Sequence, residues 1–269
     1  MSLFNFSLSE LFTFFAVLVR FSVVIAVLPF VGDRLIPAPV KILLALVVTI
    51  SLFPSLVSSG LIHPSDAVRW ASTAGGIVST LGLEVLFALF LGFTARLVFD
   101  GISFGGHLIG NFMGFASASM FDAHQESQTQ VVAQLQTALA MLIFLAIDGH
   151  HLMLRAALDS YRVVGLGRAE FSGLLSSRLI KMTSDVFIFG IQMAGPVSMA
   201  LFAVNVVFGL ISKAVPQVNV FMLSFTVSAI VGLAVMYLSA EMFHDAIVIY
   251  IERMIDSMNS IIKTIKGGG

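Results

Sequence analysis

The chain has 269 residues, of which 58% are hydrophobic and only 11% are charged, with a net charge of -1. Soluble domains average about 45–50% apolar and about 25% charged residues. The 14 basic and 15 acidic side chains are too few to cover a water-soluble globule of this size, which disfavours a soluble enzyme, a disordered protein and a nucleic-acid-binding protein.

A helix that crosses a bilayer needs about 20 consecutive apolar residues, and six such helices would use about 120. The composition therefore predicts an all-α membrane protein with about six long apolar helices and short loops. The apolar runs cover residues 11–28, 42–57, 71–95, 131–147, 186–211 and 218–240. Ser7 and Glu10 match a capping box ahead of the first run.

These runs predict a single polytopic helical domain over residues 1–266. Within it we expect N-terminal hairpins, a glycine-rich region, C-terminal hairpins and an amphipathic tail helix, at 7–100, 101–130, 131–240 and 241–266. The tail helix is indicated by isoleucine and methionine side chains at helical spacing between charged ones. Residues 267–269 are three glycines, which we set aside as a tail or an expression remnant.

Two charges lie inside predicted spans: Arg20 in the first run and Glu84 in the third. A charge at mid-bilayer costs about 2.5–3.5 kcal/mol on insertion scales, so it normally faces protein or water. We expect the two side chains to pair across helices or with a partner subunit. The alternative is an ion or proton pathway.

Small residues recur every four positions at Gly106, Gly110, Gly114 and Ala118, a spacing that lets helix backbones approach closely. Because interior glycines weaken helices, we expect irregular backbone from about residue 100 onward. Such backbone is tolerated at membrane depth only inside protein or beside a water-filled cavity. A segment there with bulky apolar side chains would act as a plug.

Proline marks two further places, where we expect a helix break and a tight turn. Pro196 lies inside the fifth apolar run, and Pro216, Gln217 and Asn219 lie between the fifth and the sixth. Broken helices are frequent in transporters. The alternative is a plain kink that neighbouring helices satisfy.

Chemical sites are poorly supported by the sequence. Cysteine is absent, and none of the six histidines forms an H-E-x-x-H pattern. We expect His150 and His151 to point to different faces of a helix, and we predict no metal site, no cofactor and no catalytic residue. The chain also has no nucleotide-binding P-loop, so it is not its own ATP motor.

The order of several motifs resembles the FliR family of type III export-gate subunits. They are Arg20, Pro29-Phe30, Pro37, Lys41, the stretch Gly110–Asp122, Ala194-Gly195-Pro196 and Pro216-Gln217-Val218-Asn219-Val220-Phe221. The resemblance covers nearly the whole chain, including its length and hydropathy profile. Asp122 is followed by Ala123, where the family pattern has a proline.

The resemblance implies broken helical hairpins like a fusion of FliP-like and FliQ-like subunits, in a hetero-oligomeric helical assembly. FliP-like, FliQ-like and FlhB-like subunits, membrane lipid and unfolded flagellar substrates would be the partners, with no nucleic acid. The resemblance would locate the protein in the bacterial inner membrane, within the flagellar basal body, with the assembled complex partly on the periplasmic side.

By the same resemblance, residues 110–121 correspond to a lumenal plug loop that keeps the export channel closed. From residue type we infer a plug or gate made by Gly110, Phe112, Met113, Gly114, Phe115, Met120 and Phe121. An injectisome export-gate subunit, a secondary transporter that uses Arg20, Glu84 and Pro196, and a purely structural assembly subunit are the alternatives.

Overall fold

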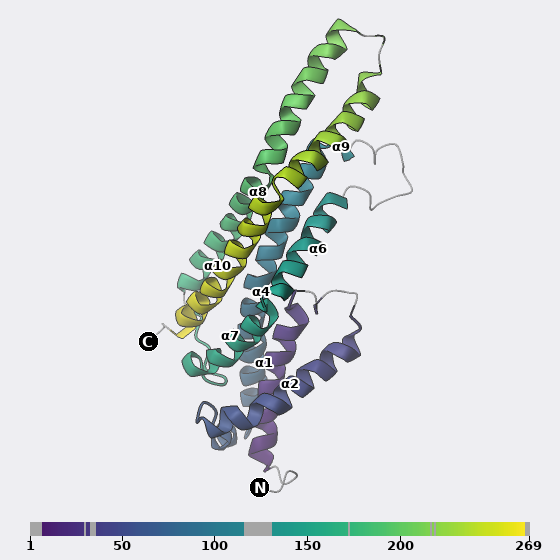
Figure 1. Ribbon diagram of the computed structural model, residues 1–269. Helices are drawn as coiled ribbons and strands as arrows, with labels where there is room; N and C mark the ends of the chain where they lie inside the picture. The colour runs from purple at the N-terminus through teal and green to yellow at the C-terminus, as the bar shows by residue number, and fades with distance from the viewer. Residues whose placement is uncertain are drawn as a thin grey trace. The chain divides into compact units, whose positions relative to one another are not determined.

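The fold is helical throughout the part of the chain that the computed structural model describes, which is residues 7–29, 31–32, 36–115, 131–171, 173–215, 217 and 219–266. The helices are α1 (Leu8–Val27), α2 (Ala38–Ser58), the 3-10 turn η1 (Pro64–Asp66), α3 (Ala67–Trp70), α4 (Ala74–Phe112), α6 (Val131–Ala146), α7 (Gly149–Val163), α8 (Gly173–Ala214), α9 (Val220–Leu238) and α10 (Ala240–Lys266). Figure 1 shows them in chain order.

Five of these helices, α1, α2, α4, α8 and α9, are long and apolar enough to cross a membrane, or six spans if α6 and α7 count as one broken span. The expected all-α membrane protein with about six long apolar helices is therefore confirmed. The capping box is also confirmed, because the Ser7 hydroxyl accepts a hydrogen bond from the Glu10 amide at 3.2 Å and a Glu10 oxygen accepts one from the Ser7 amide at 2.8 Å.

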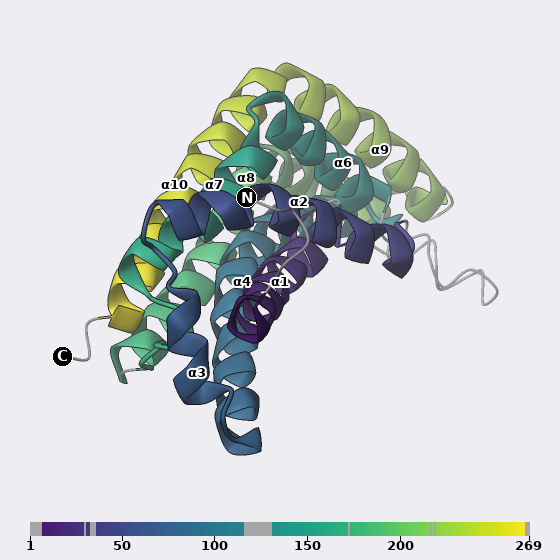
Figure 2. The same ribbon diagram turned by 90° about the horizontal axis from the view of Figure 1, so that it is seen from below.

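The chain forms two compact units. The first comprises Met1–Arg96, Asp148–Lys181 and Glu252–Gly269, and the second comprises Leu97–Ile147 and Met182–Ile251. In the first unit α1 lies alongside the N-terminal half of α4, as both views show (Figures 1 and 2). That residues 1–266 form a single polytopic domain stays a prediction.

Two helices run further than we expected. The backbone was expected to become irregular near residue 100, but α4 continues to Phe112. Likewise, α8 is one helix from Gly173 to Ala214 with Pro196 inside it, so the expected helix break at Pro196 is wrong. Proline removes one backbone donor and disfavours a helix interior, but neighbouring packing on apolar faces can hold such a helix together.

Glycines allow the C-terminal half of α4 to fit closely between α6 and α8 in the second unit. A Cβ atom at Gly106 would lie 2.5 Å from the Ala133 Cα atom of α6. On the α8 side, Cβ atoms at Gly101 and Gly105 would lie 3.3 Å from the Val186 oxygen and 3.1 Å from the Gly190 oxygen. The packing energy of these close contacts offsets the low helix propensity of glycine.

The tail helix α10 places its apolar stripe inside the protein. Its buried side chains include Ile247, Ile251, Met254, Met258, Ile262 and Ile265. In the second unit the ring of Tyr250 stacks on that of Phe189, with centroids 3.6 Å apart. Packing within the chain therefore accounts for the amphipathic pattern.

The close approach at Gly106 can be tested by replacement. Gly106→Ala should destabilise the protein by about 1–3 kcal/mol, because the added methyl group meets backbone that cannot move aside easily. The control is Gly82→Ala on the same helix, where a Cβ atom meets nothing within 4 Å, so it should be neutral or mildly stabilising. Unfolding in mild detergent gives both values, and equal effects would contradict the packing account.

Candidate functional site

The most polar buried site in the first unit joins α1, α4 and α7. Arg20 and Glu84 are 0% and 1% exposed and form an ion pair with two contacts. The Arg20 Nε atom donates to Glu84 Oε2 at 2.5 Å, and Nη2 donates to Oε1 at 2.9 Å. The structure thus brings together the two intramembrane charges singled out in the sequence.

Further groups complete the arginine's surroundings. Its Nη1 atom donates to the Ser160 hydroxyl at 2.9 Å and to the Val164 carbonyl oxygen at 3.4 Å. The guanidinium carbon lies 3.7 Å from the ring centroid of Tyr161 and 4.5 Å from that of Phe87. Aromatic faces stabilise a desolvated cation, so the charge is held by hydrogen bonds at its edge and by rings at its faces.

The carboxylate of Glu84 also holds the connection that follows α7. Its Oε1 atom accepts a hydrogen bond from the Gly167 amide at 2.7 Å. Gly167 has φ +66, and a Cβ atom there would lie 2.7 Å from Thr80 Cγ2, so only glycine fits this turn without strain. Ser160, Val164 and Gly167 could not be assigned to the site from the sequence, because they lie far from both charges along the chain.

Because both charges of this site are paired and hydrogen-bonded, the site is suited to holding helices together and not to transferring protons. Both oxygens of Glu84 and all three nitrogens of Arg20 have partners. The surroundings are also asymmetric, since a carboxylate placed at position 20 would face the Val164 carbonyl oxygen. Exchanging the two charges is therefore not expected to restore a lost function.

The second candidate site is the C-terminal end of α4, where the predicted plug begins. Met113 is fully buried, and a Cβ atom at Gly232 of α9 would lie 2.2 Å from its Cε atom. Gly114 turns the chain with φ +86. The ring of Phe115 then lies edge-on to that of Phe225, with centroids 5.8 Å apart.

The other residues predicted for this region are placed as follows. Gly110 is buried within α4 and Phe112 is 37% exposed. The Asn205 side chain of α8 donates to the Phe112 carbonyl oxygen at 3.5 Å. Ala118, Met120 and Phe121 lie outside the described residues.

The predicted turn before α9 is partly described. Gln217 lies in a turn, and Asn219 caps α9, because its side-chain oxygen accepts a hydrogen bond from the Met222 amide at 3.3 Å. Pro216 lies outside the described residues.

The sequence contains one G-x-S-x-G motif of the kind found in hydrolases, at Gly101-Ile102-Ser103-Phe104-Gly105. The G-x-S-x-G elbow requires a sharp strand-to-helix turn that exposes the serine. Ser103 instead lies inside α4, where helical hydrogen bonding leaves no such turn. The motif therefore provides no nucleophile here.

The helices, their apolar surfaces and these sites define a membrane-embedded helical protein, and comparison with known sequences gives its family. Residues 11–254 match the bacterial export proteins, family 1, and the chain belongs to that family. It is an export family and not a known family of enzymes.

Named relatives specify the resemblance further. The chain is 27% identical to the flagellar biosynthetic protein FliR of Escherichia coli (strain K12) over 229 residues, which is 85% of this chain and 84% of the relative. It is 30% identical to the flagellar biosynthetic protein FliR of Pectobacterium carotovorum over 220 residues, covering 82% and 81%. The FliR protein of Bacillus subtilis (strain 168) is 26% identical over 219 residues, covering 80% and 81%. Membership of the FliR family is confirmed.

Removing one partner of the buried ion pair should cost far more than removing an exposed one. Glu84→Gln leaves Arg20 without its counter-charge, and we expect a loss of about 3–5 kcal/mol in unfolding free energy. The control is Asp66→Asn, which removes the exposed partner of Arg69 at 3.3 Å and of Arg168 at 3.4 Å and should cost about 1 kcal/mol or less.

The double variant Arg20→Met with Glu84→Leu should lose less than Glu84→Gln, because it buries no unpaired charge. Denaturant titration in mild detergent measures all three variants. If Glu84→Gln proves as mild as Asp66→Asn, the pair does not hold the first unit together.

Proposed function

We propose that the chain is a subunit of the flagellar type III protein export gate and forms, with FliP-like and FliQ-like subunits, a channel for unfolded flagellar substrates. The family match over residues 11–254 carries the proposal. The relatives described above are all flagellar proteins, which favours a flagellar system over an injectisome.

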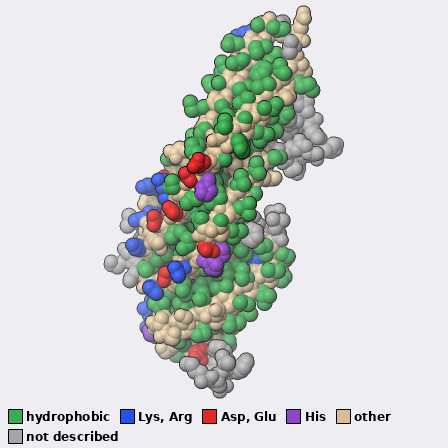
Figure 3. Space-filling view, in the orientation of Figure 1, with side chains coloured by type: hydrophobic (Ala, Val, Ile, Leu, Met, Phe, Trp, Pro, Cys, Tyr) green, Lys and Arg blue, Asp and Glu red, His purple; other side chains and the backbone are tan. Residues whose placement is uncertain are grey.

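The apolar surface of α8 and α9 supports a role as an assembly subunit. The apolar windows of α8 and α9 are only 17% and 11% buried within the chain, whereas that of α1 is 39% buried. In Figure 3 the region of α9 and the C-terminal half of α8 shows many hydrophobic side chains among uncharged atoms and very few charged side chains. Such a surface requires lipid or other subunits, and FliP-like and FliQ-like helices would cover part of it.

Helix length also favours an assembly that extends beyond the bilayer. α4 has 39 residues and α8 has 42, which correspond to about 58 and 63 Å at 1.5 Å per residue. The hydrocarbon core is only about 30 Å thick. A complex in the inner membrane that reaches to the periplasmic side of the basal body would accommodate both helices.

The mechanism is one of gating, without catalysis by this chain. An apolar constriction can exclude water and ions by dewetting, and flexible methionine side chains can repack around a passing chain. Met113 and Phe115 would begin the plug, with Gly232 and Phe225 of α9 as their seat. The residues further along that were predicted for the plug, Met120 and Phe121, would complete the seal, and an FlhB-like subunit would cap the entrance.

A secondary transporter fits the site less well. It would use Arg20 and Glu84 as an ion pathway and Pro196 as a broken helix. The two charges are satisfied by each other, and α8 continues through Pro196. A gate subunit needs neither feature.

Mass measurement after purification in mild detergent separates these functions. A gate subunit should purify with FliP-like and FliQ-like partners, because its apolar surface is completed by them. A monomer or homodimer, from cells that express all the subunits, would contradict the proposal and favour a transporter.

Gly232→Leu should open the plug by displacing Met113 from its seat on α9. We expect a raised ion conductance of the reconstituted complex, because the displaced side chain no longer completes the constriction. Gly209→Leu on α8, where an added Cβ meets nothing within 4 Å, serves as the control. Deletion of residues 114–119 should give a larger leak, and wild-type conductance in both Gly232→Leu and the deletion would exclude a gating role.

A further inference from the structure

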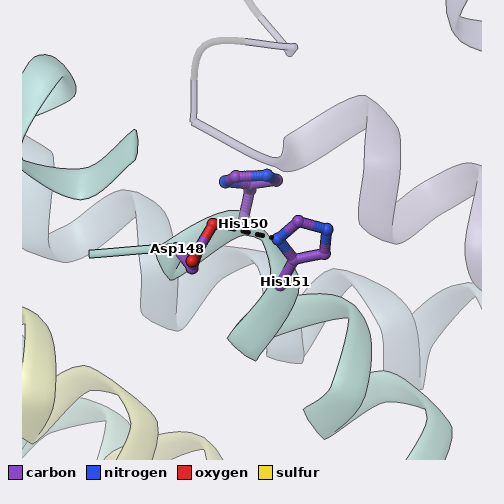
Figure 4. A group of neighbouring side chains, drawn as sticks. All are labelled: Asp148, His150 and His151. Atoms are coloured by element: carbon purple, nitrogen blue, oxygen red, sulfur yellow. Dashed lines mark hydrogen bonds and ion pairs between the residues drawn. The ribbon is translucent and has the colours of Figure 1, made fainter. Parts of the chain in front are cut away.

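We propose that Asp148, His150 and His151 form a binding site for a divalent transition-metal ion of the zinc, nickel or copper class. The three side chains lie together at the start of α7 in the first unit (Figure 4). The site shares no residue with the ion pair or with the proposed plug, and the gate function does not require it.

The three residues offer ligand atoms at a spacing close to that of a metal site. One atom from each residue lies within 4.8 Å of the others. His151 Nδ1 and Asp148 Oδ1 are 3.2 Å apart. Neighbouring ligands of a tetrahedral ion with bonds of about 2.0–2.2 Å lie about 3.3–3.6 Å apart, so the spacing of this pair is close to the required one. The ligand atom of His150 lies within 4.8 Å of the other two, so it would have to move toward them by about 1.5 Å to reach the spacing of a tetrahedral site.

The histidines were expected to point to different faces of a helix, and this expectation is wrong. Their ring centroids are 4.2 Å apart. Both residues lie in the first turn of α7, where no preceding turn of helix restricts the side-chain rotamers as it does in a helix interior. Adjacent histidines can therefore turn toward each other here.

The carboxylate of Asp148 is available for an ion because it does not cap the helix. An aspartate at the N-cap position usually accepts a hydrogen bond from a backbone amide of the first turn. Asp148 is the N-cap residue of α7, but its side chain makes no capping hydrogen bond. It faces His151 instead, as the dashed line in Figure 4 shows.

His150 provides an independent observation. Its Nδ1 atom is shielded from solvent and has no hydrogen-bond partner within the described part of the chain. A shielded polar atom without a partner loses its hydration without compensation. An ion bound by this group would compensate for that loss, either through this nitrogen directly or through a water in its coordination shell.

The ligand types define the class of ion. Imidazole suits zinc, copper and nickel, whereas magnesium and calcium prefer sites made of oxygen atoms. Three protein ligands leave at least one position for water. The side chains of Asp148 and His151 are 72% and 70% exposed, so the site is open at the surface of the chain. A bound ion would fix the first turn of α7.

The test uses the full-length chain in mild detergent, purified without a polyhistidine tag. Calorimetric titration with ZnCl₂ should show one ion bound per chain. His150→Ala and His151→Ala should each weaken binding by about tenfold or more. Asp148→Asn should also weaken it, and asparagine tolerates the left-handed backbone that Asp148 adopts at φ 57.

The matched control is His244→Ala. His244 Nδ1 lies 3.1 Å from Asp245 Oδ1, which reproduces the histidine–aspartate pair without belonging to a three-ligand group. This variant should bind zinc as the unchanged chain does. Circular dichroism and the elution volume establish that each variant is folded.

Copper gives a second readout. Electron paramagnetic resonance of one Cu²⁺ per chain should show coupling to two imidazole nitrogens, and the His150→Ala, His151→Ala double variant should lose it. Unchanged zinc affinity and an unchanged copper spectrum in the double variant would overturn the proposal. So would a loss of binding that occurs only in His244→Ala.

Discussion

The first unit depends on one buried ion pair, because Arg20 and Glu84 lie where water cannot solvate them. A charge in such a place is tolerated only when it is paired and hydrogen-bonded. The pair meets this condition by drawing α1, α4 and α7 together, and Glu84 also holds the turn at Gly167. The arrangement of these helices is therefore tied to the geometry of a single guanidinium and its carboxylate.

The second unit obtains its close packing differently. Glycines on α4 bring its backbone against α6 and α8, and Gly232 of α9 admits the Met113 side chain. Dispersion forces in such contacts depend steeply on distance, so an added methyl group has a large effect. The outer faces of α8 and α9 remain apolar and exposed, which is consistent with a subunit that is completed by its surroundings.

Local patterns were reliable where a short range of sequence decides the structure. The capping box at Ser7 and Glu10 and the apolar stripe of α10 both depend on residues within a few turns. Predictions were wrong where packing overrides local preference. Glycines near residue 105 and Pro196 weaken an isolated helix, but both lie in continuous helices. Close packing of Gly105 against α8 offsets its weak helix propensity. Helical periodicity also gave the wrong side-chain directions for His150 and His151, because both lie in the first turn of α7.

The sequence by itself determined the class of the protein, since a chain with 58% hydrophobic residues has to bury much apolar surface away from water, and long apolar helices satisfy their own backbone hydrogen bonds there. It also indicated that Arg20 and Glu84 need partners, and its motifs indicated the family. Only the tertiary structure decided which groups those partners are, because Ser160, Val164 and Gly167 reach the pair through folding. The seat of Met113 on Gly232 and the grouping of Asp148 with two histidines were decided in the same way, by contacts that no spacing along the chain encodes.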